Sequence, residues 1–594
     1  MENKIKSIRK LMKDYGVEAY LVPTSDPHQS EYVPEFWQRR KFMSGFTGSA
    51  GDVVFTQKKA GLWTDSRYFL QAEQELDKKV FTLFKIGKPD VPSIDEWVSG
   101  ELKKGESLGI DPKVIPHQNY IDLKKRLEEK GIELKSLKKN LVDAVWENRP
   151  EPPKGKIEIH EEKYAGEPFE AKLNRLRKKM GEENAETLVV TMLDSIAWLF
   201  NIRGSDVEFN PVVISYAVIT SEKALLFVNP DKIEEAVSQA LRETVDIFDY
   251  EEFGSELQNL AKQSCRIWLD EVSVNQWIVD VLGDNVKLHF KPSPIKMFKA
   301  IKNKTEIAGF RAAHIRDGAS MIKFLYWLEQ SMGKIEVTEV SAAKKSAEFR
   351  AQNELFRGLS FNTISSYGAH GAVVHYATSP ETDIQLKPEG IYLIDSGGQY
   401  LDGTTDITRT LYLGSPKEEQ KDNFTRVLKG IIDLLTTSFP EGTSGKQLDT
   451  IARLPLWEKG LNYGHGTGHG IGTYLCVHEG PQAISYYRCI GIGLELGMIT
   501  TIEPGYYKEN QYGLRIENVA LVVKDEEKSK KDFVFYKFEN LTLCPIDLCL
   551  IKKELLSKGE IDWLNNYHKK VYKTLAPLLD KPEVDWLKKA TKEL

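Results

Sequence analysis

Five residues of types that bind metal ions lie in three separated patches between Tyr392 and Val522. Four carboxylates and one imidazole make an oxygen-rich set, which suits hard divalent cations and exceeds what one tetrahedral Zn²⁺ needs. The set therefore predicts a site for two divalent ions, with Mn²⁺ as the first expectation and Zn²⁺ or Co²⁺ as alternatives. The five residues are Asp395 in YLIDSGG, Asp406 in TTDITRT, His469 in GHGTGHGIG, Glu503 in TIEPGYY and Glu517 in LRIENVALVV.

The first two aspartates are expected on a hairpin. Apolar, β-branched runs at 391–394 and 407–413 flank them, and glycines lie between the runs. If the hairpin is symmetric about their midpoint, Asp395 and Asp406 lie directly opposite each other, with Cβ atoms about 5 Å apart on one face. Two carboxylates at that separation repel each other unless a cation lies between them.

The two glutamates repeat this arrangement. Glu503 and Glu517 are equidistant from Asn510, which lies in the polar turn 508–511 between two further apolar runs. A hairpin centred on this turn places both carboxylates on the same side. His469 adds one nitrogen from a glycine-rich loop, where small residues let the backbone approach a ligand closely.

The same glycine-rich segment argues against a different metal site. His465 and His469 are four residues apart, which is the spacing of a helical zinc-protease motif. Glycine occupies every second position from 464 to 472, which favours a loop, and the sequence contains no HExxH. We therefore reject the zinc-protease interpretation.

At these residues the chain resembles a known family. The order Asp, Asp, His, Glu, Glu, with GHGTGHGIG, VHEGP and TIEPGYY, is similar to the pitta-bread metallopeptidases, and specifically to the long, three-domain Xaa-Pro aminopeptidases (aminopeptidase P). The resemblance covers nearly the whole chain. It includes DPHQSEYVPEFWQRRKFMSGFTGSAG at 26–51, LWTDSRYFLQA at 62–72 and DSIAWLFNIRGSDVEFNP at 194–211.

The resemblance implies a role for each metal ligand. Asp395 would chelate one ion, Asp406 and Glu517 would bridge both, and His469 and Glu503 would complete the other. Two ions held in this way lower the pKa of a shared water, and the resulting bridging hydroxide attacks a carbonyl carbon. Glu503 would also take the proton of that water.

The resemblance also implies residues that contact the substrate. His375 in VVHYA and His478 in VHEGP would bind the substrate amide and the tetrahedral oxygen, and His465 would shape the proline pocket. Arg67 in WTDSRYFLQA matches a substrate-contacting position of the family. The expected catalytic residues are Glu503, His375 and His478, and the expected substrate-binding residues are Arg67, His375, His465, His469 and His478.

Two stretches of the N-terminal half repeat the same order of elements. Apolar residues at helical spacing from Ile5 to Met12 lead into the strand-like AYLVP, and a predicted helix at 173–180 leads into TLVVT. We interpret this repeat as an internal duplication that produces two related α/β domains. The proline-rich, charged stretch 146–160 lacks periodicity and marks a linker between them.

A chain of 594 residues is too long for one hydrophobic core, so several domains are expected. The fold class is α/β and α+β, with two creatinase-like N-terminal domains and a C-terminal pitta-bread catalytic domain that the resemblance implies. In the long relatives a C-terminal extension helps to pair two protomers, so the resemblance also implies a homodimer. The predicted domains are 1–150, 151–302, the catalytic domain 303–525 and the extension 526–594.

The catalytic domain is expected to mix helices with the strands that bear the ligands. A long amphipathic helix at 305–332 opens it and carries His314, which we expect in the core. A second helix is predicted at 338–358, and a third, at 417–439, lies between the metal-binding patches.

Composition excludes several classes of partner. The net charge is −6 with both signs spread along the chain, which gives no basic face for nucleic acid. No run of eighteen apolar residues occurs, so no membrane span is expected. The N-terminal residues have the pattern of an amphipathic helix, so a signal peptide is not expected either. The odd number of cysteines and the absence of CxxC predict reduced thiols in a cytoplasmic protein. The cysteines are Cys265, Cys476, Cys489, Cys544 and Cys549.

Taken together, the motifs predict an aminopeptidase that hydrolyses the bond between a free N-terminal residue and a penultimate proline. Its substrates would be peptides, and the sequence does not identify the physiological peptide or the native metal. A prolidase, which cuts only Xaa-Pro dipeptides, is the enzymatic alternative, because related enzymes share the metal ligands. A non-catalytic peptide-binding or protein-binding relative is a weaker alternative, since all five ligands are present.

Overall fold

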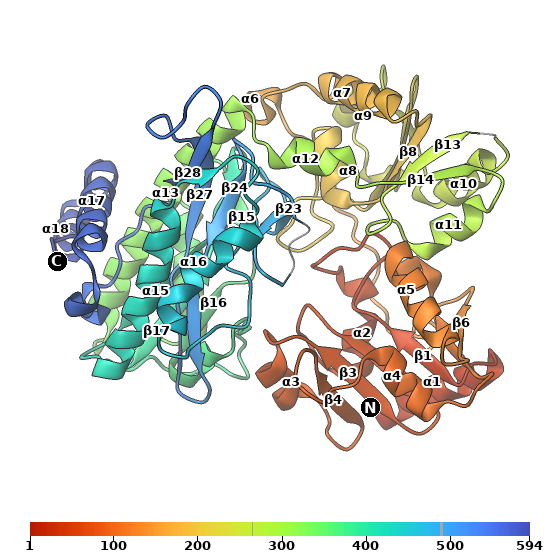
Figure 1. Ribbon diagram of the computed structural model, residues 1–594, viewed down its shortest axis with the longest axis horizontal. Coiled ribbons are helices and arrows are strands. Elements are labelled where there is room, and N and C mark those ends of the chain that lie inside the picture. Colours follow the sequence, from red (N-terminus) through yellow and green to blue (C-terminus); the bar gives the residue numbers. More distant parts are fainter. Residues whose placement is uncertain (264, 488–490) are drawn as a thin grey trace. The chain divides into compact units, whose positions relative to one another are not determined.

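The computed structural model describes residues 1–263, 265–487 and 491–594. The chain divides into two compact units with separate hydrophobic cores (Figure 1). Unit 1 comprises Met1–His160 and Glu167–Ile295, and unit 2 comprises Glu161–Gly166 and Lys296–Leu594. No disulfide joins the cysteines of the described ranges. Cys489 lies outside those ranges.

Unit 1 contains two six-stranded mixed sheets of the same topology. Their strand orders are β4-β3-β2-β1-β5-β6 and β12-β11-β10-β8-β13-β14. In each sheet the first strand in sequence, β1 or β8, pairs with one neighbour antiparallel and with the other parallel. This repeat of pairing directions confirms the predicted internal duplication.

The strands of unit 1 are short and mostly buried. They are β1 (Ala19–Val22), β2 (Asp52–Thr56), β3 (Ala60–Thr64), β4 (Phe81–Lys85), β5 (Ser107–Ile110), β6 (Glu133–Ser136), β7 (Glu158–Ile159), β8 (Thr187–Val190), β9 (Ile202–Arg203), β10 (Ser215–Thr220), β11 (Ala224–Val228), β12 (Asp246–Phe248), β13 (Arg266–Leu269) and β14 (Lys287–Phe290). The helices are α1 (Glu2–Asp14), α2 (Arg39–Ser44), α3 (Phe69–Glu75), α4 (Ile94–Glu101), α5 (His117–Glu128), α7 (Phe169–Glu182), α8 (Leu193–Leu199), α9 (Glu235–Leu241), α10 (Phe253–Leu260) and α11 (Gln276–Leu282).

The predicted N-terminal helices of both halves are present. α1 buries Ile5, Ile8 and Met12, three and four residues apart, as the spacing predicts. α7 is longer than the predicted 173–180, because it starts directly after Pro168, whose lack of an N–H suits a helix start.

Unit 2 is built on antiparallel sheets. A six-stranded sheet has the order β21-β28-β27-β24-β22-β23, and two three-stranded sheets and one hairpin, β25-β26, accompany it. In Figure 1, α13, α15 and α16 lie beside these strands, and the core packs α15 and α16 against β24, β27 and β28. The strands are β15 (Phe356–Leu359), β16 (Ile364–Tyr367), β17 (Ile391–Ser396), β18 (Gly398–Tyr400), β19 (Gly403–Thr404), β20 (Ile407–Tyr412), β21 (Phe439–Pro440), β22 (Gly468–Gly470), β23 (Glu479–Ile484), β24 (Ile499–Ile502), β25 (Gly505–Lys508), β26 (Tyr512–Arg515), β27 (Asn518–Lys524) and β28 (Phe535–Asn540).

Two of the three predicted helices of this unit match closely, and one is shorter than predicted. α13 and α15 match 305–332 and 417–439 within three residues at each end. The predicted helix 338–358 ends at Arg350, because Leu355 adopts a positive φ of 65° and β15 then pairs with β18. The sequence reasoning did not predict α16. The helices are α6 (Glu162–Ala165), α12 (Pro294–Ala300, which begins in unit 1), α13 (Lys304–Ser331), α14 (Glu339–Arg350), α15 (Glu418–Thr436), α16 (Gly445–Trp457), α17 (Lys558–Leu575) and α18 (Lys581–Ala590).

The C-terminal helices belong to the core of unit 2. Leu564, Tyr567, Val571 and Leu575 recur along one face of α17 and are buried in the same cluster as α15 and β27. His314 on α13 is also buried, and its Nδ1 lies 2.8 Å from the carbonyl oxygen of Phe310, which confirms its core position.

A buried arginine connects α17 to the predicted metal ligand Glu517, which lies between β26 and β27. The Arg409 guanidinium donates to the Glu517 carbonyl at 2.8 Å and to the Tyr567 hydroxyl at 3.0 Å. That hydroxyl in turn donates to the Cys544 carbonyl at 2.8 Å. α17 thereby supports the backbone at Glu517.

Replacement of Tyr567 by Phe removes this hydroxyl and with it the hydrogen bonds to Arg409 and to the buried Cys544 N–H. We expect Tyr567→Phe to lower the free energy of unfolding by about 1–3 kcal/mol. Urea unfolding followed by circular dichroism measures the change. Tyr572→Phe on the same helix, where the ring is only partly buried, is the matched control. Equal midpoints for the two variants would contradict the role of Tyr567.

Candidate metal centre

The hairpin of the two aspartates differs from the predicted register. β17 and β20 place Asp395 opposite Thr408, and β18 and β19 continue this register with Tyr400 opposite Gly403. The predicted direct opposition of Asp395 and Asp406 is therefore wrong.

The position of the turn has a physical cause. Tyr400 is fully buried and donates a hydrogen bond to Asp317 at 3.0 Å, so it cannot occupy the turn. The turn instead falls at Leu401 and Asp402, and Arg316 forms an ion pair with Asp402. Side chains alternate along a strand, so Asp406 lies on the same face as Thr408, two residues away. Asp395 is opposite Thr408, and Asp406 is therefore its diagonal neighbour on that face.

The glutamate pair follows the predicted symmetry. β24 and β27 pair Ile502 with Asn518, and β25 and β26 pair Gly505 with Arg515. Both pairs belong to one register, which places Glu503 opposite Glu517. The backbone of Glu517 also donates to the Thr408 carbonyl, at 3.1 Å, so the glutamate hairpin lies against β20 of the aspartate hairpin.

His469 presents one ring nitrogen to the carboxylates. Its Nδ1 lies 3.0 Å from the Gly470 carbonyl, which can only accept a hydrogen bond, so Nδ1 carries the proton. The lone pair is then on Nε2, which lies 3.6 Å from Asp406 Oδ2 and 3.8 Å from Glu503 Oε1. Hydrogen bonding of the second ring nitrogen in this way is typical of histidine ligands.

Three of the five predicted ligands form a compact set. One ligand atom from each of Asp406, His469 and Glu517 lies within 4.8 Å of the other two. Within the described ranges this is the one group of three or more His, Cys, Asp or Glu side chains with such spacing. Glu503 adjoins it through His469.

Charges and unsatisfied oxygens in this set fit divalent cations. Asp395 Oδ1 and Asp406 Oδ1 are buried and have no hydrogen-bond partner among the described residues. Burial, and then the neighbouring carboxylates, raise the pKa of Asp406 and of Glu517 well above their ordinary values. A divalent cation would satisfy these oxygens and relieve the repulsion.

Arg515 supplies a positive charge next to the acidic residues. Its Nη2 donates to Asp395 Oδ2 at 2.6 Å and its Nη1 donates to the Tyr507 hydroxyl at 2.6 Å. Burial by itself would lower the pKa of Arg515, but Tyr507, Asp395 and Glu503 raise it well above the ordinary value. Burial raises the pKa of Tyr507 to about 12, although Arg515 opposes this shift. Arg515 is therefore charged and Tyr507 is neutral near pH 7.

A hydrogen-bond chain runs from Arg515 to His465. His465 Nδ1 lies 2.7 Å from the Gly466 carbonyl, so it carries the proton and Nε2 accepts from the Tyr507 hydroxyl at 2.8 Å. The sequence analysis did not identify Arg515, Tyr507 or Thr408 as site residues. The Thr408 hydroxyl donates a hydrogen bond to Glu517 at 2.8 Å. Strand alternation could have indicated two of them, because Arg515 and Thr408 each lie two residues from a predicted ligand.

The other predicted histidines of unit 2 lie around the same set. The His478 ring packs edge-on against His469 with ring centroids 4.3 Å apart. His465 Nδ1 lies 4.0 Å from Glu503 Oε2. The carbonyl of Val374, next to His375, accepts a hydrogen bond from Arg515 at 3.4 Å. The structure thus brings His465 and His478, and the segment that carries His375, to the acidic set.

A buried ion pair supports the glycine-rich loop. Arg453 and Asp449 lie on α16 and are fully buried, with Nε 2.7 Å from the carboxylate. Arg453 also donates to the His465 carbonyl at 2.7 Å, and Thr467 donates to Asp449. The Thr467 carbonyl accepts from the Glu503 backbone at 2.7 Å, so this pair connects the loop to the predicted ligand Glu503.

Arg67, the remaining predicted site residue, lies in unit 1. Its guanidinium donates to both oxygens of Asp65, at 2.8 and 2.7 Å. Burial opposes its charge, but the hydrogen bonds to Asp65 raise the pKa of Arg67 above the ordinary value. A substrate contact of Arg67 stays a prediction.

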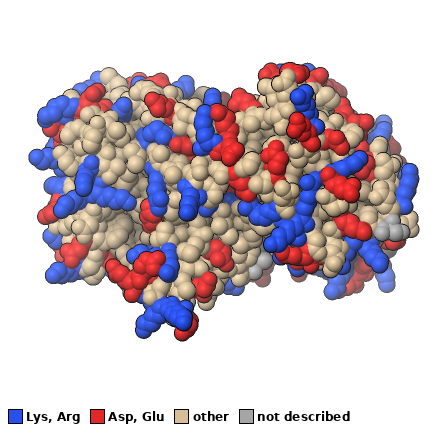
Figure 2. Space-filling view, turned by 90° about the horizontal axis from the view of Figure 1, so that it is seen from above, with Lys and Arg blue, Asp and Glu red and all other residues tan. Residues whose placement is uncertain are grey.

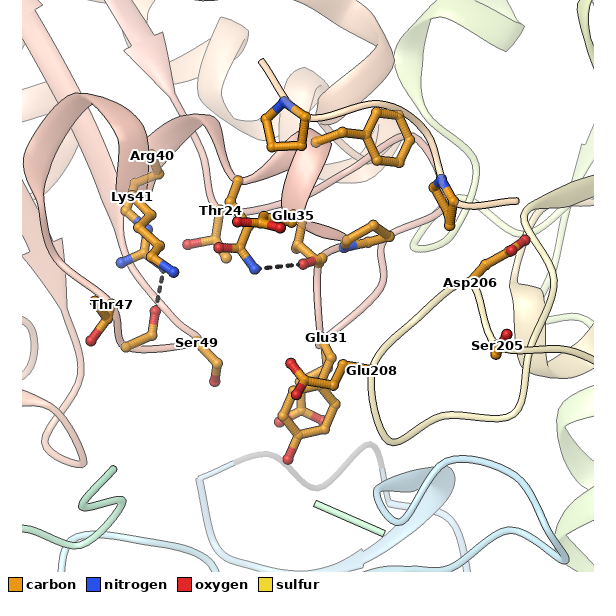
Figure 3. A pocket seen from close by; sticks show the side chains of 18 of the residues that line it. Thr24, Glu31, Glu35, Arg40, Lys41, Thr47, Ser49, Ser205, Asp206 and Glu208 are labelled. Atoms are coloured by element: carbon orange, nitrogen blue, oxygen red, sulfur yellow. Dashed lines mark hydrogen bonds between the residues drawn. The ribbon is translucent and has the colours of Figure 1, made fainter. Parts of the chain in front are cut away.

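Unit 1 also contains a cavity of about 700 Å³ that includes no predicted site residue. Figure 3 shows the acidic Glu31, Glu35 and Glu208 around it, with Arg40 and Lys41 on one side. The Arg40 guanidinium donates hydrogen bonds to the carbonyls of Phe46 and Gly48. The described residues here form no cluster with metal-ligand spacing.

The surface agrees with the charge pattern of the sequence. Lys and Arg are interspersed with Asp and Glu over the face shown in Figure 2, without a continuous basic field. In the described part of the chain, no helix combines the length and apolar character needed to cross a bilayer.

Family models cover most of the chain. The Creatinase/Prolidase N-terminal domain matches residues 4–145 and again 148–306. Metallopeptidase family M24 matches 308–524, and the C-terminal region of peptidase M24 matches 534–594. Two creatinase-type domains followed by an M24 domain define the class of this protein as a metallopeptidase.

Comparison with individual proteins identifies the family within the metallopeptidases to which the chain belongs. A probable Xaa-Pro aminopeptidase P of Coprinopsis cinerea is 42% identical over 97% of this chain and 95% of its own length. Aminopeptidase P2 of Arabidopsis thaliana is 40% identical over 98% of this chain and 86% of its own length. The X-prolyl aminopeptidase of Caenorhabditis elegans, described as a cytosolic enzyme with a di-nuclear active site, matches with a TM-score of 0.96 and 35% identity over 100% of this chain and 99% of its own. The chain belongs to the Xaa-Pro aminopeptidase P family.

Raised carboxyl pKa values make metal binding depend on pH. Protons compete with the cation for Asp406 and Glu517, so binding releases protons and weakens as pH falls. We therefore expect the rise in Tm caused by Mn²⁺ to be larger at pH 8 than at pH 5.5. Differential scanning fluorimetry measures it, and Glu517→Gln should show a smaller rise at pH 8. A shift independent of pH would refute this assignment of the protonated groups.

Proposed function

We propose that the chain hydrolyses the bond between a free N-terminal residue and a penultimate proline, with two divalent ions bound in unit 2. The observation that carries the proposal is the convergence of two acidic hairpins and His469 on one buried set, with carboxylate oxygens that lack a partner. Membership of the aminopeptidase P family supports the reaction and the substrate class.

The proposed ligands are Asp395, Asp406, His469, Glu503 and Glu517. When bound, two divalent ions supply an activated water nucleophile and polarise the scissile carbonyl. The chemistry of the donors, four carboxylates and one imidazole, makes Mn²⁺ our first choice, with Zn²⁺ or Co²⁺ as alternatives. Arg515 forms an ion pair with Asp395, so its positive charge offsets part of the negative charge of the four carboxylates.

The residues around the set have separate proposed tasks. Glu503 accepts the proton of the attacking water, since its side chain is 18% exposed while Asp406 and Glu517 are buried. His478, beside His469, and His375 bind the substrate amide and stabilise the tetrahedral oxygen as donors. The Arg515, Tyr507 and His465 chain holds His465 in one orientation, so that the ring can form a fixed wall of the proline pocket.

The proposal extends to place and assembly. The C. elegans relative is described as cytosolic, and we propose the same compartment for this chain. A homodimer and a substrate contact from Arg67 are further proposals that rest on the family resemblance.

Removal of the proposed base tests the function. Metal-stripped protein should be inactive, and Mn²⁺ should restore cleavage of Xaa-Pro-Yaa but not of Xaa-Ala-Yaa. We expect Glu503→Gln to lower kcat by about 10²–10⁴-fold, the range for loss of a general base. Glu509→Gln, an exposed position in the turn of the same hairpin, should keep wild-type kcat.

Substrate length separates the two enzymatic alternatives. Turnover of Xaa-Pro-Yaa supports an aminopeptidase, whereas turnover of the Xaa-Pro dipeptide alone would indicate a prolidase. Binding of peptides without any turnover in the presence of metal would favour the non-catalytic alternative.

A further inference from the structure

A buried cluster of three charged residues in unit 2 lies outside the proposed ligands and substrate contacts. Lys302 Nζ donates to Glu479 Oε1 at 2.5 Å, and Lys299 Nζ lies 3.0 Å from Glu479 Oε2. Each of the three side chains is only 1% exposed. Lys302 Nζ also donates to the Lys299 carbonyl at 2.8 Å. Buried charges this close are strongly constrained in position, because separating them would leave a charge without a partner.

The Glu479 carboxylate belongs to a residue that is next to His478 in sequence and near His469 across the strand pair. Glu479 is the first residue of β23 and pairs with Gly470 of β22, so it directly follows His478 and lies opposite the neighbour of His469. Val477 and Glu479 are buried, whereas His478 between them is only partly buried. The Glu479 side chain therefore points into the interior from the same short segment that presents His478.

A glycine makes room for this carboxylate. A Cβ on Gly472 would lie 2.8 Å from Glu479 Oε2, which is closer than real Cβ contacts come. The glycine-rich loop that carries His469 thus passes directly beside the Glu479 carboxylate.

The lysines belong to a segment that is itself attached to a metal-binding strand. Lys299 lies on α12, and Lys302 lies in the short connection to α13. The backbone of Lys302 donates to the Gly497 carbonyl at 3.1 Å, and Ile301 forms a bridge with Met498. β24 begins at the next residue and ends one residue before Glu503. One segment therefore contacts both the strand that leads to Glu503 and the side chain that follows His478.

We propose that Lys299, Lys302 and Glu479 are positioning residues, a clamp that sets His478 and His469 relative to Glu503. The clamp acts through other residues and does not touch the reacting atoms. This inference rests on the proposed function, because it assigns the clamp to the same site. It predicts that the charges matter for the geometry of the histidines more than for folding.

The test compares variants that separate positioning from stability. Lys302→Met leaves Glu479 with one partner, and we expect kcat on Xaa-Pro-Yaa to fall at least tenfold with a smaller change in KM. Lys302→Arg, which keeps the charge, should recover part of this loss. The triple variant Lys299→Met, Lys302→Met and Glu479→Leu removes all three charges, and buried ion clusters replaced in this way often retain stability. Lys304→Met, an exposed position two residues on, is the control.

A second measurement reports the geometry without turnover. The visible absorption of the Co²⁺-loaded protein depends on ligand arrangement, and we expect it to change in the triple variant and not in Lys304→Met. A triple variant with wild-type kcat and an unchanged Co²⁺ spectrum would overturn the clamp. A wild-type protein that binds Co²⁺ but cleaves no Xaa-Pro-Yaa would refute the proposed function instead, and the spectrum of the triple variant would still decide on the clamp.

Discussion

The burial of several carboxylates beside one another is the constraint on which unit 2 depends. Asp395, Asp406 and Glu517 are each less than a tenth exposed, and Glu503 adjoins them across His469. Like charges in a poorly solvated interior are costly, and they persist only when cations or protons balance them. The raised pKa values of Asp406 and Glu517 express this cost, and the oxygens without partners indicate where cations would bind.

Buried cationic side chains hold the backbone around this set. Arg409 binds the carbonyl of Glu517, Arg453 binds the carbonyl of His465, and Arg515 binds both Asp395 and the carbonyl of Val374. Each guanidinium offers several donors in a fixed plane, so each can fix one site segment against a helix, a hairpin or the C-terminal region. Lys299 and Lys302, which contact the buried Glu479 carboxylate, are the ammonium groups for which we propose a similar role. Segments far apart in sequence are in this way held beside the proposed metal ligands.

Much of this architecture was predictable from local sequence patterns. Helical spacing identified α1, α13 and α15, and the repeated order of elements identified the two related sheets of unit 1. The symmetry of the turn at Asn510 placed Glu503 opposite Glu517 because both flanking strand pairs obey it. The five predicted metal ligands came from residue types and from the family resemblance, and the structure brings ligand atoms of Asp406, His469 and Glu517 within 4.8 Å of one another.

Other features depend on tertiary contacts that no local pattern contains. The aspartate hairpin turns one residue later than symmetry suggests, because Tyr400 is drawn into the core by Asp317 on α13. α14 ends earlier than predicted because β15 pairs with β18, about forty residues further along the chain. Arg515 and Tyr507 become site residues only when β26 lies beside β17 and the glycine-rich loop. Long-range strand pairing thus decides where a turn falls or a helix ends when the local sequence is compatible with more than one position.

Metal stoichiometry tests the central claim most directly. Wild-type protein saturated with Mn²⁺ and then freed of loose metal should retain two ions per chain by inductively coupled plasma mass spectrometry. Asp406→Asn, which removes the charge of a proposed bridging ligand, should retain fewer than two at the same free Mn²⁺ concentration. Wild-type protein that holds one ion or none, or an Asp406→Asn variant that still holds two, would contradict a dinuclear centre built on these residues.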